Sequence, residues 1–419
     1  MGTYEPRVQG YDEAIASSVR GLWCLAMDID ALRADTPGCF DVVHFNNAGT
    51  SLPPRPVIDA QISWINQEAH TGGYEMAEDL QEQVAGVYGS LARLIGADPS
   101  EIALMENATV AWWQAFHSLD LQGKTVLTSE VDYGANFISY LQAARRDDVE
   151  TVVVPSDESG QISLEELEKR LDERVGLLAV SHMPTNGGLV NPAAEIGAMA
   201  REAGVPFLLD ACQTVGQMPI DVDAIGCSFL SATGRKYLRG PRGTGFLYAR
   251  SSFLEANEPL MLDHFGASWV EPERYVLRPD ARRYETWESN HAIKAGLGVA
   301  AEYAMSVGLE SIAGRVFALA AGLRDKLTGI GATTYDLGRV KGGIVTFSVP
   351  GVDAAAVKRE LRAQSINTSL VDPASTLIDA KRRHLPEMVR ASVHYYNTSG
   401  EIDTLIAALE PWSTRSRDG

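Results

Sequence analysis

Leu208-Leu209-Asp210-Ala211-Cys212-Gln213 is an apolar run that ends abruptly in a carboxylate. A second short apolar run, Cys227–Leu230, leads into Ser231-Ala232-Thr233-Gly234-Arg235-Lys236, where a lysine lies among Thr, Gly and Arg. The glycine-rich segment Gly240–Gly245 follows closely. Because parallel α/β sheets bind ligands at the carboxyl ends of their strands, we expect Asp210 and Lys236 to emerge at one such edge.

Short β-branched or apolar runs alternate with helical patterns through the middle of the chain. The strands that we expect are Thr125–Thr128, Thr151–Val154, Leu177–Ser181, Pro206–Asp210, Ser228–Leu230 and Thr244–Tyr248. Two amphipathic helices, separated by Thr71-Gly72-Gly73, are expected over 57–96. This alternation predicts an α/β domain built on a largely parallel sheet.

The pattern changes near Asn290. A long helical stretch over 290–329 precedes strand-like runs at 343–348, 366–371 and 390–394 and a final helix near 399–410, which predicts a smaller α+β domain. We therefore divide the chain into three parts. These are an N-terminal segment (1–55) that packs with the small domain, a large domain (56–289) and the small C-terminal domain (290–419).

Composition and net charge favour an ordinary globular protein over a nucleic-acid-binding or membrane protein. The 419 residues are 45% hydrophobic and 22% charged, as in an ordinary globular protein, and the net charge of −19 argues against nucleic acid or an anionic membrane as partner. Residues 1–6 lack the features of a signal peptide, and no apolar run approaches the roughly 20 residues of a membrane span. The cysteines, which form no CxxC pair, are Cys24, Cys39, Cys212 and Cys227. We expect a reduced, cytoplasmic enzyme.

The combination of Asp210 and Lys236 predicts pyridoxal phosphate. In such sites a lysine forms a Schiff base with the cofactor, and an aspartate keeps the pyridine nitrogen protonated. Taken alone, Asp210 is more simply a strand-end residue that caps a turn. Lys236, however, lies between an apolar run and a glycine-rich segment, a poor place for a solvated lysine, and burial makes an amine nucleophilic.

The phosphate of this cofactor needs hydrogen-bond donors and positive charge. Thr233 and Arg235 flank Lys236 closely enough to reach one anion. Thr109 precedes an expected helix, where an anion is favoured, although a plain N-cap is an equal alternative. Tyr133 follows another strand and is expected either to stack on the cofactor ring or simply to pack.

Arg390 lies in a strand of apolar and small residues, so its charge needs a partner. A substrate α-carboxylate suits its bidentate geometry, and an internal salt bridge is the alternative. The eight histidines show no metal-ligand spacing, so we predict no metal site. Gly240–Gly245 has a GxxGxG arrangement late in the domain, which argues against a dinucleotide.

These residues resemble the class V aminotransferase-fold family of fold-type I pyridoxal-phosphate enzymes. The family includes cysteine desulfurases, selenocysteine lyases, isopenicillin N epimerases and ergothioneine-type C–S lyases. The resemblance runs from about Phe45 to Asp403. Its anchors are Asn107-Ala108-Thr109, Ser181-His182-Met183-Pro184-Thr185-Asn186-Gly187-Gly188, Asp210-Ala211-Cys212-Gln213, the Lys236 loop and Arg390–Thr398.

The resemblance implies a mainly parallel sheet of the seven-stranded type, pyridoxal 5'-phosphate as cofactor, and a homodimer with active sites at its interface. It implies that Lys236 is the Schiff-base lysine, Asp210 the partner of the pyridine nitrogen and Gln213 a neighbour of the phenolic oxygen. Further cofactor contacts are implied for Ala108, Thr109, Tyr133, Thr185, Thr233 and Arg235. Substrate contacts are implied for Arg390 and Asn47.

Departures from the family pattern bear on the reaction. Desulfurases carry a histidine where this chain has Arg235 and usually stack a histidine where it has Tyr133. They also need a mobile cysteine in the C-terminal half to accept sulfur as a persulfide, whereas the last cysteine here is Cys227. We therefore expect no persulfide-type desulfurase. The Gly-Thr pair that many relatives extend to the partner's phosphate is missing from Tyr284–Asn290.

The sequence thus predicts an enzyme acting at the α-carbon of an amino acid or amino-acid conjugate, with Lys236 as general base. Loss of a β-thiol group would make it a C–S lyase, which we favour. Reprotonation at the cofactor would make it an aminotransferase, and reprotonation on the opposite face an epimerase. A non-catalytic amine-binding protein is disfavoured by the intact Lys236, Asp210 and Arg390, and a dehydrogenase by the lack of an early glycine fingerprint.

Overall fold

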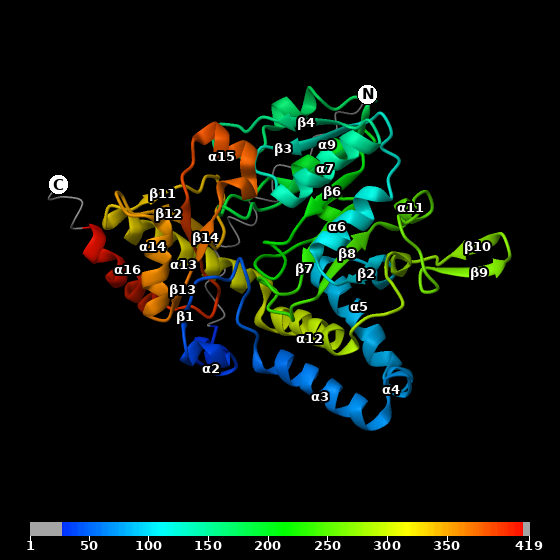
Figure 1. Cartoon of the computed structure of the whole chain (residues 1–419), viewed down its shortest axis with the longest axis horizontal. Helices are drawn as coiled ribbons and strands as arrows, with labels where there is room; N and C mark the ends of the chain where they lie inside the picture. Colours follow the sequence, from blue (N-terminus) through cyan, green and yellow to red (C-terminus); the bar gives the residue numbers. More distant parts are fainter. Residues whose placement is uncertain (1–26, 414–419) are drawn as a thin grey trace, which may run out of the picture.

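The computed structural model describes residues 27–413, so the N-terminal residues 1–6 and Cys24, which entered the predictions above, lie outside the described residues. The chain forms a larger body around one wide sheet and a smaller body that contains the C-terminal helix (Figure 1).

A seven-stranded sheet with the order β2-β8-β7-β6-β5-β3-β4 forms the larger body. Its strands are β2 (Ile102–Met105), β3 (Thr125–Ser129), β4 (Glu150–Val154), β5 (Val175–Ser181), β6 (Phe207–Asp210), β7 (Phe229–Thr233) and β8 (Gly245–Ala249). The five strands from β7 to β4 are parallel, and β8 is antiparallel to both of its neighbours. The predicted fold class is confirmed, with β2 as a strand that the sequence patterns did not indicate.

Successive residues of the central strands enter different cores. Leu208 packs with α6 (Ala108–His117) and α7 (Gly134–Arg146) on one face of the sheet. Leu209 packs on the other face, with α5 (Gln81–Ile95), α9 (Ala193–Glu202) and α12 (His291–Val307). Because helices cover both faces, these strands are continuous apolar runs without polar alternation.

Further elements surround this sheet. They are α3 (Arg55–Thr71), α4 (Gly73–Asp79), α8 (Leu164–Glu168), α10 (Val222–Ile225), α11 (Ser251–Leu254) and the 3₁₀ turns η2 (Pro99–Glu101) and η3 (Ala281–Tyr284). Three helices, not the predicted two, cover 57–96. The helix α3 is capped by Gly72, whose φ of 102° favours glycine, and a second break at Leu80 separates α4 from α5. A hairpin of β9 (Ala267–Glu271) and β10 (Arg274–Leu277) projects from the body (Figure 1).

The smaller body contains an antiparallel sheet with the order β11-β12-β15-β14. Its strands and helices are β11 (Thr333–Thr334), β12 (Ile344–Ser348), β14 (Ser369–Val371), β15 (Met388–Ser392), α13 (Leu309–Gly329), α14 (Ala354–Ala363), η4 (Pro373–Thr376), α15 (Leu377–Arg383) and α16 (Ser399–Ser413). The predicted stretch over 290–329 is two helices, which meet at Gly308 (φ 91°). Since α12 packs against α3 and α5, it lies with the larger body; the division of the chain at 289 stays a prediction.

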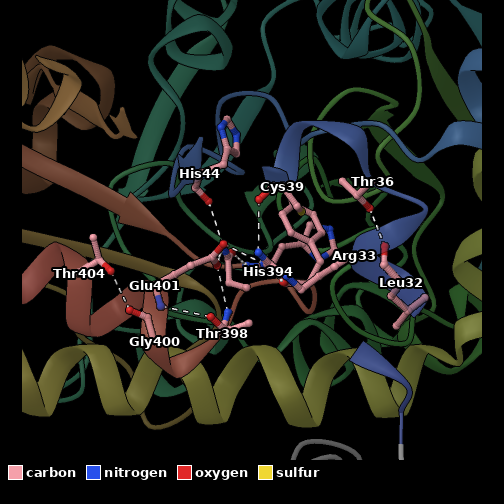
Figure 2. Close-up of polar contacts among 12 residues, drawn as sticks. Leu32, Arg33, Thr36, Cys39, His44, His394, Thr398, Gly400, Glu401 and Thr404 are labelled. Atoms are coloured by element: carbon pink, nitrogen blue, oxygen red, sulfur yellow. Dashed lines mark hydrogen bonds and ion pairs between the residues drawn. The ribbon is translucent and has the colours of Figure 1, made fainter. Parts of the chain in front are cut away.

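The N-terminal segment runs along the smaller body. It contains α2 (Ile29–Ala34), η1 (Pro37–Phe40) and β1 (Val43–His44), which pairs with β13 (Ile366–Asn367). Figure 2 shows Arg33, whose Nη1 lies 2.8 Å from Oε1 of Glu401 on α16 and also donates to the backbone oxygen of Tyr396. These contacts fasten the segment beside the C-terminal helix.

No single helix within residues 27–413 has the length and apolar character needed to cross a membrane. The pair α12 and α13, bent by 79°, meets that criterion only when both helices are taken together.

Candidate active site

Asp210 ends β6 at the carboxyl edge of the large sheet, beside Ser181 of β5 and Ser231 of β7. Its Oδ1 accepts a hydrogen bond from the backbone N–H of Cys212 at 3.0 Å, and its Oδ2 accepts one from Nδ2 of Asn136 at 3.2 Å. The carboxylate is buried, and both of its oxygens are held. Its orientation is therefore fixed before any ligand arrives.

Lys236 lies in the loop after β7. The residue as a whole is partly exposed, but its amine is enclosed, and burial lowers the pKa of Lys236. The thiol of Cys212 and the carboxylate of Asp210 oppose this shift, whereas Arg235 and Arg390 add to it. The structure thus brings Lys236, Asp210, Arg235 and Arg390 into one electrostatic neighbourhood, as the sequence predicts for the first two.

Arg390 in β15 meets the loop after β5. Its Nη1 donates to the backbone oxygen of Thr185 at 3.0 Å and to its Oγ1 at 2.8 Å. Its Nη2 lies 3.5 Å from Oδ1 of Asn46, and its buried Nε has no hydrogen-bond partner among residues 27–413. Burial lowers the pKa of Arg390 to about 10. An arginine without a carboxylate partner fits a site that receives an anion.

The side chain of Asn47 forms its hydrogen bonds within the chain. Its fully buried Nδ2 donates to the backbone oxygen of Ser392 at 2.7 Å, and its Oδ1 accepts from the hydroxyl of Tyr396. These bonds use the amide to join the N-terminal loop to the small sheet. Asn46, one residue earlier, contacts Arg390, and the substrate contact expected for Asn47 stays a prediction.

Arg235 reaches toward the loop before α3 and not toward Thr109. Its Nη1 donates to the backbone oxygen of Gly49, and its own backbone oxygen accepts from Ser51 at 2.9 Å. Burial lowers the pKa of Arg235, and Arg235 in turn lowers that of Arg390. Thr233 is buried, with Oγ1 3.4 Å from the backbone oxygen of Thr244.

The N-terminus of α6 lies beside the start of β8. Asn107 is the N-cap, since its Oδ1 accepts from the backbone of Val110, so Ala108 and Thr109 form the first turn. A Cβ on Gly245 would lie 2.8 Å from the backbone carbon of Asn107, so only glycine permits this approach. The first N–H groups of a helix have no intrahelical partner and attract anions.

Tyr133 and Gln213 contribute from two other elements. Tyr133, 40% exposed, precedes α7, and its phenol is close enough to raise the pKa of both Arg235 and Arg390. Nε2 of Gln213 donates to the backbone oxygen of Ala48 at 3.3 Å, while its buried Oε1 has no partner among the described residues. Tyr133 therefore lies near Arg235 and Arg390, and Gln213 lies beside the loop that Arg235 contacts.

Sequence reasoning missed three residues behind Asp210. Asn136 bridges Asp210 and Asp132, and Tyr140 donates to Asp132 from one helical turn farther on. Their spacing of four was the available signal, because residues four apart share one face of a helix. In the described part of the chain, no group of three His, Cys, Asp or Glu side chains is arranged to hold a metal ion.

Comparisons with known proteins agree with this arrangement. The model of the family "Aminotransferase class-V" matches residues 43–405. A probable cysteine desulfurase of Methanothermobacter thermautotrophicus is 30% identical over 392 residues, which cover 92% of this chain and 98% of the relative.

Solved structures are similar over nearly the whole chain. The apo cysteine desulfurase of Thermococcus onnurineus NA1 has a TM-score of 0.87 at 25% identity and covers 93% of this chain and 99% of its own. The cystine C–S lyase C-DES, in complex with its product cysteine persulfide, has a TM-score of 0.81 at 22% identity, with 90% and 99% covered. A variant of C-DES holds glycine covalently linked to its PLP cofactor.

Proposed function

Because the chain belongs to the aminotransferase class V family of pyridoxal-phosphate enzymes, we propose that it is a lyase of the C–S type. Its substrate would be an amino acid or amino-acid conjugate with a sulfur substituent on the β-carbon. The observation that carries this proposal is the convergence of Asp210, Lys236 and Arg390 at one edge of the large sheet. The desulfurase and C–S lyase named among its relatives act on sulfur-containing substrates, which supports the same class.

The residues of this edge fit pyridoxal phosphate. Asp210 offers a fixed carboxylate to the ring nitrogen, and the orphaned Oε1 of Gln213 suits a polar group of the ring. Lys236 would hold the cofactor covalently through Nζ, and Tyr133 would lie against the ring. The first turn of α6 (Ala108 and Thr109), together with Thr233, would hold the phosphate. For Arg235 the contact with Gly49 favours the substrate side of the site over the phosphate.

Each remaining side chain has a distinct task. Arg390 binds the α-carboxylate of the substrate, and Thr185 and Asn46 fix the position of its guanidinium. The lowered pKa of Lys236 lets part of its amine stand neutral, so it can take the proton from the α-carbon. The bound cofactor supplies an electron sink that stabilises the negative charge left at that carbon.

Sulfur is expected to leave with a product and not on a protein thiol. After Cys227 the sequence contains no cysteine, and Cys227 itself is buried. Cys212 lies close to Asp210 and Lys236, but burial raises the pKa of its thiol well above the ordinary value, so it stays protonated. A protonated thiol is a poor nucleophile. We therefore propose a direct elimination without a persulfide carrier.

The deciding experiment reconstitutes the purified protein with pyridoxal phosphate and adds cysteine, cystine and cysteine S-conjugates. Elimination yields a 2-oxo acid, ammonia and a thiol or persulfide, all measurable in one assay. Lys236→Ala should abolish the absorbance band of the Schiff base between Lys236 and the cofactor and lower turnover by about 10²- to 10⁴-fold. Lys169→Ala, at an exposed lysine on the surface, is the matched control.

Other product patterns would redirect the proposal. A 2-oxo acid formed without release of sulfur or ammonia indicates an aminotransferase, and exchange of the α-proton without net product indicates an epimerase. A wild-type protein with no Lys236-dependent band would refute the cofactor assignment itself.

We also propose a homodimer. A hollow of about 870 Å³ lies between α3, α4 and residues 287–292, and exposed apolar side chains line it, including Ile65, Tyr74 and Trp287. Exposed apolar groups that gather in this way favour burial against a second surface. Light scattering should give twice the chain mass for the wild type and the single mass for Tyr74→Glu combined with Ile65→Glu.

A further inference from the structure

Asp132 is a second buried carboxylate behind Asp210. It lies in the loop between β3 and α7, is only 2% exposed, and accepts five hydrogen bonds. Oδ1 accepts from Oγ of Ser181 at 2.6 Å, from the backbone N–H of Tyr133 at 2.8 Å and from Nδ2 of Asn136 at 3.1 Å. Oδ2 accepts at 2.8 Å from the hydroxyls of Thr128 and Tyr140. Burial raises the pKa of Asp132, and the hydrogen bonds from Ser181, Tyr140 and Thr128 oppose that shift. Because the donors on Oδ1 include two N–H groups that cannot accept a proton, the five hydrogen bonds together favour the ionised carboxylate.

The side-chain amide of Asn136 donates hydrogen bonds to both carboxylates, Asp132 and Asp210. Its Nδ2 lies 3.1 Å from Oδ1 of Asp132 and 3.2 Å from Oδ2 of Asp210, so each of its two N–H groups serves one carboxylate. The side chain is buried in the first turn of α7. A change in the position or charge of Asp132 is therefore transmitted directly to Asp210.

The two carboxylates lack a cation that would balance both charges. Among residues 27–413, no lysine or arginine forms an ion pair with either acid. The titratable groups that face Asp210 are Asp132, Tyr140, Cys212 and Lys236, of which only Lys236 is basic. If Lys236 holds the cofactor, its free ammonium is no longer available. The site then needs a positive charge from the ligand.

We propose that Asp132 is a positioning residue that holds the proton on the ring nitrogen of the cofactor, acting through Asn136 and Asp210. This inference rests on the proposed function, because it needs the pyridine ring at Asp210. Asn136 sets the rotation of the Asp210 carboxylate, and Asp132 places a second negative charge behind it. Two anions in a buried site favour a protonated ring nitrogen more strongly than one. A protonated ring is the better electron sink, so the pair supports the proposed reaction without touching the substrate.

The test follows the ring nitrogen directly, by ¹⁵N NMR of bound pyridoxal phosphate labelled at that atom. The wild type and Ser139→Ala should hold the proton across neutral and mildly alkaline pH. Ser139 is the matched control because its hydroxyl, one turn from Asn136, donates to the backbone oxygen of Ala135 and, among residues 27–413, to neither carboxylate. Asp132→Asn and Asn136→Ala should lower the proton affinity of the ring by about tenfold or more. Tyr140→Phe, which keeps both charges and the shared amide, should give a smaller drop.

Two further readouts separate this role from a purely structural one. For Asp132→Asn and Asn136→Ala, kcat should fall by roughly ten- to a hundredfold, the range for one hydrogen bond to a charged group, while KM for the substrate stays within about twofold. Tyr140→Phe should lower kcat less, and Ser139→Ala should leave it unchanged. Melting of the cofactor-free proteins reports whether the variants fold; if Asn136→Ala does not, Asp132→Asn and Tyr140→Phe decide.

The outcomes are distinguishable. Folded variants that keep the ring proton as firmly as the wild type overturn the inference. A wild type that binds the cofactor through Lys236 but leaves the ring nitrogen unprotonated also overturns it, while the proposed function stands. A wild type that binds no pyridoxal phosphate refutes the proposed function, and the inference with it.

Discussion

Lys236 and Arg239 lie three residues apart in the loop after β7, and their pKa values shift in opposite directions. The pKa of Lys236 is lowered, because burial of its amine outweighs the nearby Asp210. Burial also opposes the charge of Arg239, but the tyrosines around it raise its pKa above the ordinary value. A hydrogen bond from the backbone of Arg239 to that of Lys236, at 2.9 Å, joins the two positions.

Arg239 receives its stabilising contacts from the chain itself. Its guanidinium lies 4.6 Å from the ring centre of Tyr396 and 5.2 Å from that of Tyr395. It donates to the backbone oxygen of Leu52 at 2.8 Å and to Oγ1 of Thr36 at 2.6 Å. Within residues 27–413, neither Lys236 nor Arg390 has a comparable set of tyrosine rings and hydrogen-bond acceptors around its charge. The comparison teaches that cations whose donors are satisfied within the chain serve the fold, whereas a buried donor without a partner, such as Nε of Arg390, marks the place where a ligand binds.

The largest effect on stability is expected for Arg239→Met. The substitution leaves Thr36, Leu52 and Tyr395 without a buried donor, so the free energy of unfolding should fall by about 3–5 kcal/mol. Urea unfolding measures this loss. The protein that stays folded should bind substrate with an unchanged KM. A variant that instead loses substrate affinity and keeps its stability would contradict the division between the two cations.

His182 is a third buried base, and its imidazole, unlike the guanidinium of Arg239, stays neutral. Burial at the end of β5 lowers the pKa of His182 from its ordinary 6.5 to about 4. Between these values the unfolded chain binds a proton that the folded chain does not. Stability should therefore be full above pH 6.5 and fall by about 3 kcal/mol as the pH drops to 4.

His182→Gln tests that assignment by urea unfolding at several pH values. The wild type should lose stability over this window, and the variant should lose about 3 kcal/mol less. The exposed His264→Gln is the control and should follow the wild type. Equal pH slopes for wild type and His182→Gln would show that another group titrates.

The sequence predicted the strands that position Asp210 and Lys236 better than it predicted the remaining strand and the contacts of individual side chains. The apolar runs before Asp210 and Lys236 mark strands because both faces of the sheet are covered, and the carboxyl edge of a parallel sheet brings their ends together. β2 was missed, since the four residues Ile102–Met105 include only one that is β-branched. The contact of Asn46 with Arg390 was missed because it depends on a bridge from the loop to Ser392, far away in sequence.

Arg390→Lys probes the other side of the comparison and should act on binding. Lysine keeps the charge but loses the planar fork, and one hydrogen bond to a charged group contributes about 1.5–3 kcal/mol. KM for a substrate with an α-carboxylate should rise by roughly ten- to a hundredfold, as steady-state kinetics would show. The melting temperature should change little, because no carboxylate of the described chain loses a partner. Unchanged KM would place the carboxylate elsewhere, with Arg235 as the next residue to vary.

The smallest effect is expected at Arg33, the arginine of the N-terminal segment that does have a carboxylate partner (Figure 2). Arg33 is partly exposed and Glu401 is buried just below the surface, with 10% of its side chain exposed, and a pair so near the surface contributes up to about 1 kcal/mol. Arg33→Ala, Glu401→Gln and the double variant form a cycle whose coupling energy urea unfolding can measure. The coupling should shrink with added salt, because a pair near the surface is screened. If the coupling energy instead equals the loss at Arg239, the ion pair holds the segment as strongly as the tyrosine-lined guanidinium does. The contrast between Lys236 and Arg239 would then not explain by itself how the N-terminal segment is held.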